Sequence, residues 1–344
     1  MEEPRAVGGQ RRRLRVPVRE RALRVEDLIV IDGHRTRREV LAERLQAGGY
    51  RLWQTAHFLL AERDQEPRRL LVHFFAPREL DADLGACFLN ELRPAGWLAG
   101  PDDLGRLFAG VIGSSDPHDP ARAWRRYGEN TLQRYRSLLQ ADHAAHSQTS
   151  PCPDSPITIF ASLYRRVRLL LQQEPAGATG RLLDAGCSFG FLPLLLAEAC
   201  PGLKEIVGLD LRPDAFLIAQ QLAAERGWRQ IRFVQADLCR AEQIIALGQF
   251  DTVVALHVLE HFDPEEGEQV LSHLLMVARR RLIIAVPYEE QPEPVYGHRQ
   301  TFSPTALDEL GRRCLKRWGQ YQGRYWCEEC AGGLLVIERD HDGV

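Results

Sequence analysis

The chain has 344 residues, of which 44% are hydrophobic and 26% are charged, and its formal net charge is -3. These values are typical of a globular protein with one large or two modest cores, and the small net charge gives no reason to expect nucleic acid as a partner. The apolar runs are shorter than the roughly 20 residues that span a membrane. The charged N-terminus is not followed by an apolar region, so we expect neither a membrane protein nor a secretory signal.

Residues 1–24 hold eight arginines against three glutamates, with little apolar periodicity. This pattern predicts a solvated, disordered tail, or else an electrostatic arm for an acidic partner. Residues 25–120 alternate between runs typical of strands and of helices: a strand at 25–33, a short helix stopped by Gly48 and Gly49, one strand each in 50–64 and 68–77, and leucine-rich helices. We predict a small α/β accessory domain here, followed by a helical lead-in and linker over residues 121–178.

From residue 179 to the end at 344, short apolar strands alternate with helices. The strands are predicted at 182–183, 206–209, 231–234, 252–256 and 282–286, and an antiparallel pair closes the chain. Pro213 and Pro264 lie where a first helical turn tolerates proline, and Gly227 lies where a helix ends. The alternation predicts an α/β fold, a doubly wound Rossmann-like sheet that is mostly parallel and binds its ligand at the carboxyl ends of the strands.

The stretch LLDAGCSFGF, residues 182–191, follows the first of these strands. It matches the dinucleotide fingerprint G-x-G-x-x-G poorly, because Ser188 stands at the second glycine position. Gly186, Ser188 and Gly190 have the G-x-S-x-G spacing of a hydrolase nucleophile elbow, which would make Ser188 a nucleophile. Asp184, two residues before Gly186, and the acids farther along favour a nucleoside ligand instead.

Two more acids end the next two strands. Asp210 closes IVGLDL, where it could accept hydrogen bonds from a ribose diol, and Asp237 closes FVQADL, where an adenine amino group could donate to it. The first loop has no lysine or arginine to hold a phosphate. Three carboxyl groups at three successive strand ends therefore indicate a long, amine-bearing nucleoside lying across the sheet.

The segments LLDAGCSFG, VGLDL, VQADL and FDTVVALHVLEHF resemble the successive motifs of class I S-adenosylmethionine-dependent methyltransferases, a likeness that covers roughly residues 155–340. The resemblance implies an enzyme that binds S-adenosylmethionine. By this resemblance, Asp184, Gly186 and Gly190 line the methionine end, Asp210 binds the ribose, and Asp237 with Leu238 binds the adenine. Ser188 and Leu256 are further expected cofactor-binding residues. The family usually has glycine in place of Ser188.

Methyl transfer to a hydroxyl requires alignment of the acceptor and removal of a proton. His257, Glu260 and His261 follow the fourth strand, and His298 lies in the long loop after the fifth. A helix starting near residue 258 would place His257 and His261 on the same side. One or more of these histidines could be the general base. Alternatively, Glu260 and His261 could cap the helix and shape the pocket without a chemical role.

The four residues could also hold a divalent metal. They are similar to the E-x-x-E-H motif and distal histidine of the small-RNA 2'-O-methyltransferases, with His257 in place of the first glutamate. By this likeness, the ligands are His257, Glu260, His261 and His298. A metal bound to two neighbouring hydroxyls would position a diol and lower the pKa of the acceptor, and three imidazoles favour Mn, Fe, Co or Zn over Mg.

The loop VPYEEQPEPVYGHRQTF, taken with SFGFLPLL and LHVLEHF, is similar to mycofactocin oligosaccharide methyltransferases, which implies a glycan hydroxyl as the acceptor. Other acceptors stay open, including natural products and the ribose of RNA, as does a non-enzymatic sensor or scaffold that binds the cofactor. A homodimer is a further possibility. The scattered cysteines favour a cytoplasmic protein, and the single pair Cys327 and Cys330 is expected to be structural rather than zinc-binding.

Overall fold

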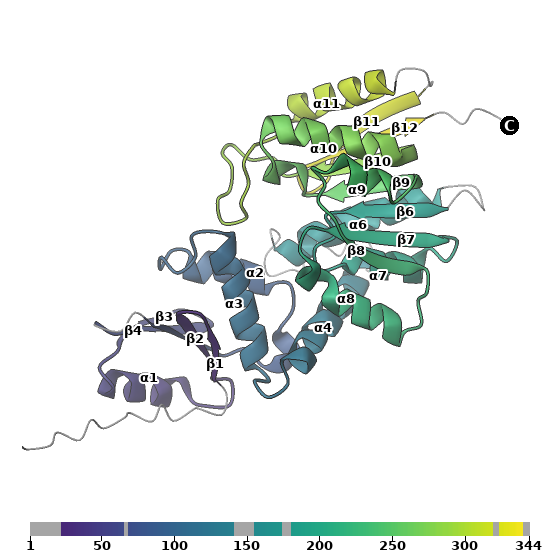
Figure 1. Cartoon of the computed structure of the whole chain (residues 1–344). Helices are drawn as coiled ribbons and strands as arrows, with labels where there is room; N and C mark the ends of the chain where they lie inside the picture. The colour runs from purple at the N-terminus through teal and green to yellow at the C-terminus, as the bar shows by residue number, and fades with distance from the viewer. Residues whose placement is uncertain (1–21, 65–67, 141–154, 174–179, 319–322, 340–344) are drawn as a thin grey trace, which may run out of the picture. The chain divides into compact units, whose positions relative to one another are not determined.

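A computed structural model of the chain describes residues 22–64, 68–140, 155–173, 180–318 and 323–339. The chain divides into two units, Met1–Pro77 with Arg106–Ala123, and Arg78–Gly105 with Trp124–Val344. Each unit contains one β-sheet, drawn in purple and in teal to yellow in Figure 1. The two units are described separately below.

The sheet of the second unit has seven strands in the order β11-β12-β10-β9-β6-β7-β8. The five strands β6 to β10 are parallel, whereas β12 pairs antiparallel with β10 and β11 pairs antiparallel with β12. This arrangement confirms the predicted doubly wound, mostly parallel sheet with an antiparallel end. The bounds are β6 (Arg181–Ala185), β7 (Glu205–Asp210), β8 (Ile231–Gln235), β9 (Phe250–Leu256), β10 (Ala278–Val286), β11 (Gly323–Glu329) and β12 (Gly333–Arg339).

Both faces of this sheet are buried, which explains why its central strands read as continuous apolar runs. Val253 of β9 packs into the core that contains α9, α10 and α11, whereas its neighbour Val254 packs into the core that contains α6 and α7. Ile284 and Ile283 of β10 alternate in the same way. The helices are α6 (Pro156–Gln172), α7 (Phe191–Ala199), α8 (Pro213–Glu225), α9 (Ala241–Ile245), α10 (Pro264–Val277) and α11 (Pro304–Arg317).

Three of these helices begin with an N-cap side chain that is followed by proline. The side chains of Ser155, Asp263 and Ser303 accept hydrogen bonds from backbone amides three residues later, at the starts of α6, α10 and α11. Each cap satisfies an amide that has no partner within the helix. These starts fix where the loops before α10 and α11 end, and both loops contribute to the candidate site.

The strand order reverses between the adjacent strands β6 and β9. Strand β7, which follows β6 in the chain, lies on one side of this pair, and β10, which follows β9, lies on the other side. Ligands of doubly wound sheets bind in the crevice outside the carboxyl ends of the strands at such a reversal. The segments that follow Ala185 of β6 and Leu256 of β9 therefore lie at the position where a ligand is expected.

The first unit contains a mixed five-stranded sheet in the order β1-β2-β5-β4-β3. Within this sheet, β2 and β5 pair in parallel, and the other three strand pairs are antiparallel. The segment 50–64, predicted as one strand, is a hairpin of β3 and β4; its turn is closed by the Phe58 amide, which donates to Thr55 Oγ1 at 3.1 Å. Bounds are β1 (Ala22–Val25), β2 (Leu28–Asp32), α1 (Arg38–Ala47), β3 (Arg51–Gln54), β4 (Phe58–Glu62) and β5 (Arg69–His73).

Helical segments occupy residues 77–140. They are η2 (Pro77–Glu79), α2 (Leu84–Cys87), η3 (Phe88–Leu92), α3 (Pro101–Ser114) and α4 (Pro120–Gln140). Within the first unit, His73 of β5 is buried and its Nε2 lies 3.0 Å from Ser114 Oγ. Burial lowers the pKa of His73 to about 4, so this histidine is neutral at pH 7 and serves the packing of α3 on the sheet.

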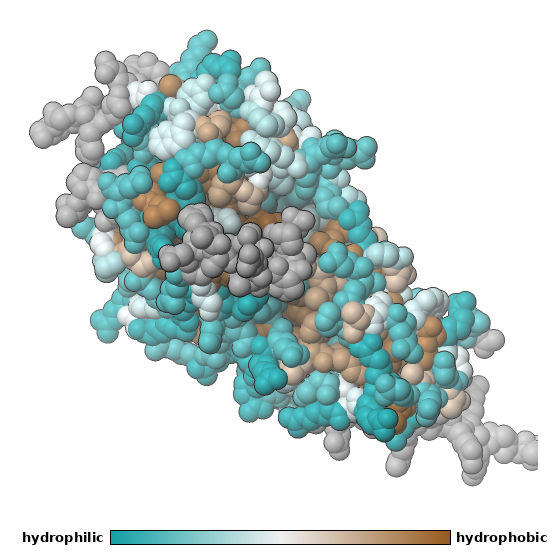
Figure 2. All heavy atoms as spheres, turned by 180° about the vertical axis from the view of Figure 1, so that it is seen from behind, coloured by the Kyte–Doolittle hydropathy of each residue, from teal (hydrophilic) through white to brown (hydrophobic). Residues whose placement is uncertain are grey.

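The described helices include none with the length and apolar character needed to cross a membrane. The face drawn in Figure 2 is mostly hydrophilic, with hydrophobic residues gathered in smaller groups. The seven cysteines within the described residues are all free. Cys327 belongs to β11, which extends to Glu329, so this cysteine lies in a strand.

Candidate active site

The loop after β6 has left-handed residues at three alternate positions. Gly186, Ser188 and Gly190 have φ values of +76°, +47° and +71°. The amides of Gly186 and Cys187 both donate to the Leu209 carbonyl at 2.8 Å, which ties the loop to β7. Ser188 adopts the conformation that glycine would adopt more easily, at a cost of about 1–2 kcal/mol. The tight loop is therefore kept despite the serine.

Glycine is required at position 190 for space as well as for conformation. A Cβ atom there would lie 2.6 Å from the Cβ of Ala219 in α8 and 2.6 Å from the ring of Phe233 in β8. Real carbon atoms do not approach so closely, so a larger residue would push α8 away from the loop. The glycines of this loop thus keep the start of α7 tightly packed at the sheet edge.

Asp184 is buried at the end of β6 without a compensating charge. Its exposed fraction is 4%, and no hydrogen bond or ion pair joins its carboxyl group to the residues that the structure describes. Burial, together with the negative charge of Asp210, raises the pKa of Asp184 to about 8. A cationic ligand placed beside this carboxyl group would remove the penalty of burying it.

Asp210 connects the end of β7 to the first loop. Its Oδ2 accepts from the Ser188 amide at 2.8 Å and its Oδ1 accepts from the Arg212 amide at 3.0 Å, which fixes the orientation of the carboxylate. Asp237 follows β8, where its Oδ1 accepts from the Cys239 amide at 2.9 Å. Three acids thus follow one another along three adjacent parallel strands, as the sequence predicts.

Two apolar residues predicted to bind the cofactor, Leu238 and Leu256, lie at carboxyl ends of strands in the same sheet. Leu238 follows Asp237 and is buried, with an exposed fraction of 7%, and Leu256 ends β9 with an exposed fraction of 6%. Leu238 also belongs to the core that contains α9 and α10, which holds the segment after β8 in place. Leu238 and Leu256 thus lie at the ends of strands that β6 and β7 separate in the sheet.

The segment after β9 differs from the expected helix start. His257 has a left-handed φ of +53°, and the short 3-10 turn η5 covers Leu259–His261, whereas α10 begins only at Pro264. A helix from residue 258, which would place His257 and His261 on the same side, does not form. Helix α10 begins at Pro264, where the sequence predicts a first helical turn, and Asp263 caps it. In this turn, His257 Nδ1 lies 3.6 Å from Glu260 Oε1.

Glu260 and His261 are adjacent in the sequence, and the fold brings His298 from the loop after β10 to them. One possible ligand atom from each lies within 4.8 Å of the others. The amide of Arg299 donates to the Glu260 carbonyl at 2.7 Å, and the Arg299 guanidinium binds Asp263 at 2.8 Å. These bonds hold the loop after β10 against η5 and bring His298 to Glu260.

Glu260 is the most unusual member of this group. It is fully buried, and both of its carboxyl oxygens lack a hydrogen-bond partner among the described residues. Burial raises the pKa of Glu260 to about 8, and the nearby charge of Glu289 adds to this effect. A buried carboxyl group without partners costs several kcal/mol when ionised, so this position suits a bound cation.

The pKa values of His257 and His261, the histidines on either side of Glu260, are lowered. Burial and the neighbouring His298 and His261 lower the pKa of His257 to about 4, and burial also lowers the pKa of His261. The Nε2 atom of His257 is buried without a hydrogen bond to the described residues. Neutral imidazoles can bind a metal or accept a proton. One carboxylate and two imidazoles, from Glu260, His261 and His298, form a donor set that fits a divalent metal.

The loop residue Glu289 contacts His298 directly. The His298 Nδ1 atom lies 3.0 Å and 2.8 Å from the two carboxyl oxygens of Glu289. Sequence reasoning placed Glu289 in the loop without assigning it a role, because nine residues separate the two partners and no periodicity relates them. It also gave no signal for Phe160 of α6, whose ring centroid lies 5.3 Å from that of His257.

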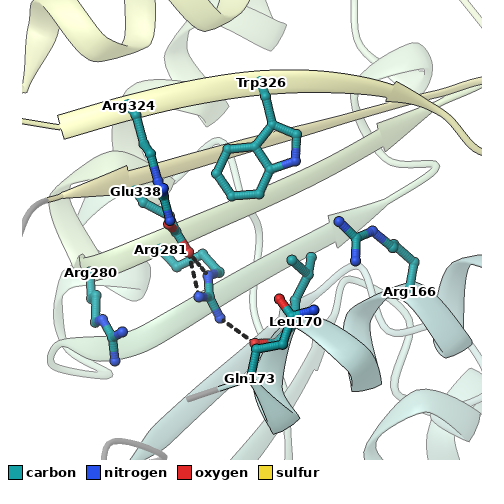
Figure 3. Close-up of a pocket in the computed structure, with 8 residues that line it drawn as sticks. All are labelled: Arg166, Leu170, Gln173, Arg280, Arg281, Arg324, Trp326 and Glu338. Atoms are coloured by element: carbon teal, nitrogen blue, oxygen red, sulfur yellow. Dashed lines mark hydrogen bonds and ion pairs between the residues drawn. The ribbon is translucent and has the colours of Figure 1, made fainter. Parts of the chain in front are cut away.

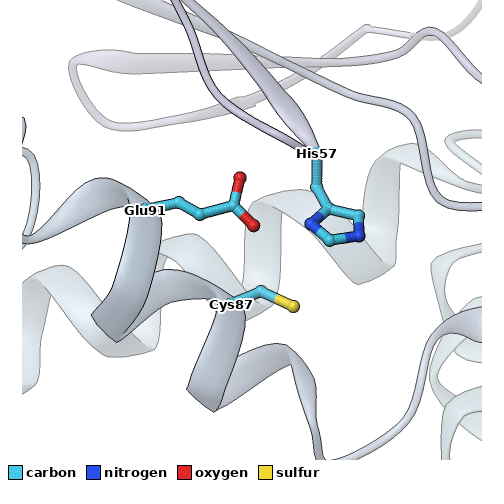
Figure 4. A group of neighbouring side chains, drawn as sticks. All are labelled: His57, Cys87 and Glu91. Atoms are coloured by element: carbon cyan, nitrogen blue, oxygen red, sulfur yellow. The ribbon is translucent and has the colours of Figure 1, made fainter. Parts of the chain in front are cut away.

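A second group of possible metal ligands consists of His57, Cys87 and Glu91 (Figure 4). Cys87 ends α2 and Glu91 lies four residues later in η3, both in the second unit, whereas His57 belongs to the first unit. We therefore assign no site to these three residues.

Residues 182–281 match the family model described as a methyltransferase domain. This part of the chain is a methyltransferase domain. The match spans β6 to β10 and so includes the three acids and the segment from His257 to His261. The predicted class I methyltransferase domain, with S-adenosylmethionine as its cofactor, is thereby confirmed.

Two curated relatives are methyltransferases. The chain is 36% identical over 104 residues to magnesium-protoporphyrin O-methyltransferase of Synechocystis sp., covering 30% of this chain and 42% of the relative. It is 26% identical over 209 residues to ribosomal protein L11 methyltransferase of Geobacter metallireducens, covering 58% of this chain and 64% of that protein. The chain thus spans less than two thirds of either relative.

Solved structures with a similar fold include the methyltransferase domain of bacterial CtHen1, with 17% identity, a TM-score of 0.43, and coverage of 52% of this chain and 99% of that chain. Magnesium protoporphyrin IX methyltransferase from Synechocystis with bound SAM has 23% identity, a TM-score of 0.42, and coverage of 60% and 89%.

Replacing Asp210 tests the cofactor site. We expect Asp210→Ala to weaken S-adenosylmethionine binding by about 100-fold, because two hydrogen bonds to a charged acceptor are lost and the loop at Ser188 loses its anchor. Isothermal titration calorimetry measures the affinity. The matched control is Asp214→Ala, which removes an exposed acid four residues away that pairs only with Arg212 among the described residues. Equal affinities in the two variants would contradict the assignment.

Proposed function

We propose that this protein transfers the methyl group of S-adenosylmethionine to a hydroxyl group, and that the acceptor is a sugar with two neighbouring hydroxyls. The observation that supports it is the buried, partnerless carboxyl group of Glu260, with His261 and His298 around it. This group follows β9, the strand beside β6 at the reversal of strand order. The acceptor hydroxyl can there approach a cofactor held by the loop after β6.

The acids of the sheet edge hold the cofactor in this proposal. Asp184 lies at the cationic methionine end, Asp210 accepts hydrogen bonds from the ribose hydroxyls, and Asp237 accepts one from the adenine amino group. Gly186, Ser188 and Gly190 keep the loop flat enough for close approach, Leu238 contacts the base, and Leu256 contacts the cofactor from the end of β9. The methyl carbon then points toward the segment that contains His257.

The reaction is an in-line displacement. The bond between sulfur and the methyl carbon breaks as the acceptor oxygen forms its bond to that carbon, and the hydroxyl proton passes to a base. We propose His257 Nε2 as this base, since it is neutral, buried and without a hydrogen bond to the described residues. Correct alignment of the reacting groups supplies much of the acceleration.

Glu260, His261 and His298 would hold a divalent cation, with Mn, Fe, Co or Zn favoured by the two imidazoles. Such a cation supplies Lewis-acid polarisation of the acceptor hydroxyls when bound. In the structure, His257 lies beside Glu260 but outside the group of three ligands, at 3.6 Å. We therefore propose three ligands rather than four, with His257 left to take the proton.

Glu289 is proposed to position His298. Because the His298 Nδ1 donates its proton to the Glu289 carboxylate, the other ring nitrogen, Nε2, carries the lone pair and can bind a cation. Glu289 comes from the segment that follows β10, and the bonds of Arg299 to Asp263 and Glu266 hold the other side of the same loop. This arrangement fixes both the ring orientation and the tautomer.

The choice of acceptor within this class is also a proposal. Similarity to mycofactocin oligosaccharide methyltransferases in the loop 286–302 supports a glycan, and the free cysteines support a cytoplasmic setting. The terminal ribose of RNA is the second candidate, because it offers the same vicinal diol. The sequence around Glu260, His261 and His298 also resembles the small-RNA methyltransferase motif, and these residues lie close together.

Methyl transfer from labelled S-adenosylmethionine to a panel of acceptors tests the proposal. The panel contains glucose oligosaccharides, the same sugars with one hydroxyl of each pair removed, phenols, and RNA with a 3'-terminal diol. We expect label in the intact sugars and little in the deoxygenated ones. A sugar that lacks one hydroxyl of the pair cannot bind the metal through two oxygens. Transfer to phenols alone, or to none of the acceptors, would contradict it.

The same assay carries its own control variants. We expect Glu260→Gln to lower the rate by about 100-fold while the affinity for S-adenosylmethionine changes less than about twofold, because the group acts on the acceptor. Glu265→Gln removes an exposed charge at the start of α10 and should leave the rate unchanged. If the protein binds the cofactor but transfers no methyl group to any acceptor in the panel, a non-enzymatic sensor or scaffold would be favoured.

The positioning role of Glu289 predicts a graded result. Binding of Mn²⁺ or Zn²⁺ alone, measured by calorimetry, should weaken by about 10–100-fold in Glu289→Ala. It should weaken less in Glu289→Gln, whose amide oxygen can still accept the Nδ1 proton. The neighbouring exposed Glu290 provides the control variant Glu290→Ala. Metal affinities unchanged in Glu289→Ala would show that His298 needs no partner to hold its orientation.

A further inference from the structure

Two half-buried aromatic rings border the proposed base and the proposed metal ligands. Phe160 of α6 has its ring centroid 5.3 Å from that of His257, the proposed base, and 5.8 Å from that of Tyr164, one helical turn later. Tyr296, in the loop after β10, has its ring centroid 5.6 Å from that of His298. Both rings belong to the second unit, as does the site that they border.

The two rings contact opposite members of this site. Glu260 lies near both histidines, because its Oε1 is 3.6 Å from His257 Nδ1 and one of its oxygens lies within 4.8 Å of a ring nitrogen of His298. No ring contact joins Phe160 to Tyr296 within the described part of the chain. The site therefore has one aromatic ring beside His257 and a second one beside His298.

The site reaches the surface at His261. Glu260 is buried, whereas His261 is exposed and His298 is half-buried. The hydroxyl group of Tyr296 makes no hydrogen bond to the residues that the structure describes, and the ring is half-buried like that of Phe160. A molecule that reaches the metal ligands from solvent thus meets polar groups in the middle and aromatic surface at the edges, as in many ligand sites.

The loop after β10 gives this edge of the site a negative charge. Residues 287–302 contain three glutamates and one arginine. That arginine, Arg299, is paired with Asp263 at 2.8 Å and with Glu266 at 2.6 Å. Glu290 is exposed and has no charged partner among the described residues. A polyanion would meet repulsion here, so the loop favours an acceptor without charge.

The pocket drawn in Figure 3 is separate from these rings. It lies where β10 begins, at Arg280 and Arg281, whereas the loop with Tyr296 follows the other end of that strand at Val286. Arg281 is already paired there, since its Nε donates to Glu338 Oε1 at 2.6 Å. We therefore assign no ligand to this pocket.

We propose that Phe160 and Tyr296 form an acceptor subsite in which an aromatic ring stacks on an uncharged pyranose. This inference rests on the proposed function and names the side chains that select its substrate. A pyranose with equatorial hydroxyls presents axial C–H bonds on both faces, and such an apolar face packs on the flat face of an aromatic ring. The hydroxyls at the rim of the sugar then remain free for the metal and for His257. The subsite selects neutral oligosaccharides over RNA.

Binding of cellotriose to the full chain tests this inference. The protein is loaded with Mn²⁺ and S-adenosylhomocysteine, so that no methyl group can be transferred, and calorimetry measures the affinity. We expect saturable binding that is about tenfold weaker in Phe160→Leu and in Tyr296→Leu, because leucine keeps an apolar side chain but removes the ring. Tyr296→Phe keeps the ring and should bind cellotriose as the unchanged protein does.

The matched control is Trp228→Leu. Trp228 is a half-buried aromatic residue shortly before β8 begins at Ile231, and so lies at the end of the sheet opposite the active site. This variant should bind cellotriose with unchanged affinity. The affinities for Mn²⁺ and S-adenosylmethionine should also be unchanged in Phe160→Leu and Tyr296→Leu, which would show that the metal and cofactor sites remain folded.

The outcomes separate this inference from the proposed function. Cellotriose that binds through both rings but receives no methyl group from S-adenosylmethionine would contradict the proposed function and support the subsite. Absence of cellotriose binding, or equal affinities in Phe160→Leu, Tyr296→Leu and the unchanged protein, would overturn the inference. So would RNA with a 3'-terminal diol that binds more tightly than cellotriose and loses its affinity in Phe160→Leu.

Discussion

Two carboxyl groups, Asp184 and Glu260, are buried at the same edge of the sheet without a positive partner in the described residues, and the rest of the site is organised around them. Burying an ionised carboxylate alone costs several kcal/mol, and the pKa of each group rises to about 8 in response. A core optimised only for stability would place apolar residues at these positions. A cationic cofactor at Asp184 and a metal at Glu260 would offset this cost.

The sheet places these two buried carboxyl groups at neighbouring strands. Asp184 is the next-to-last residue of β6 and Glu260 lies in the turn after β9, and the two strands are neighbours where the strand order reverses. Left-handed residues occur at both loops, at Ser188 and His257, so local backbone strain coincides with buried charge. In the proposed function, the first loop holds the methyl donor and the second holds the acceptor. One topological feature therefore brings the two reactants together.

The sequence predicted the features that depend on local pattern. Apolar runs located β6 to β10, and the acids at their ends, such as Asp210, could be assigned because parallel strands place their carboxyl ends on one edge. Features set by longer-range contacts could not be predicted. The pairing of Glu289 with His298 depends on the path of a long loop. The β3–β4 hairpin has no glycine or proline in its turn, so no local signal divides residues 50–64 into two strands.

The most direct test of the account is the number of protons released when S-adenosylmethionine binds. Calorimetry at pH 7 in buffers of different ionisation enthalpy measures this number for the unchanged protein and for Asp184→Asn. With a pKa of about 8, roughly 0.9 of the Asp184 carboxyl groups carry a proton before binding, and a cation beside them expels most of it. The account predicts a release larger by more than about half a proton in the unchanged protein than in the variant. Equal proton release, or no binding to the unchanged protein, would contradict it.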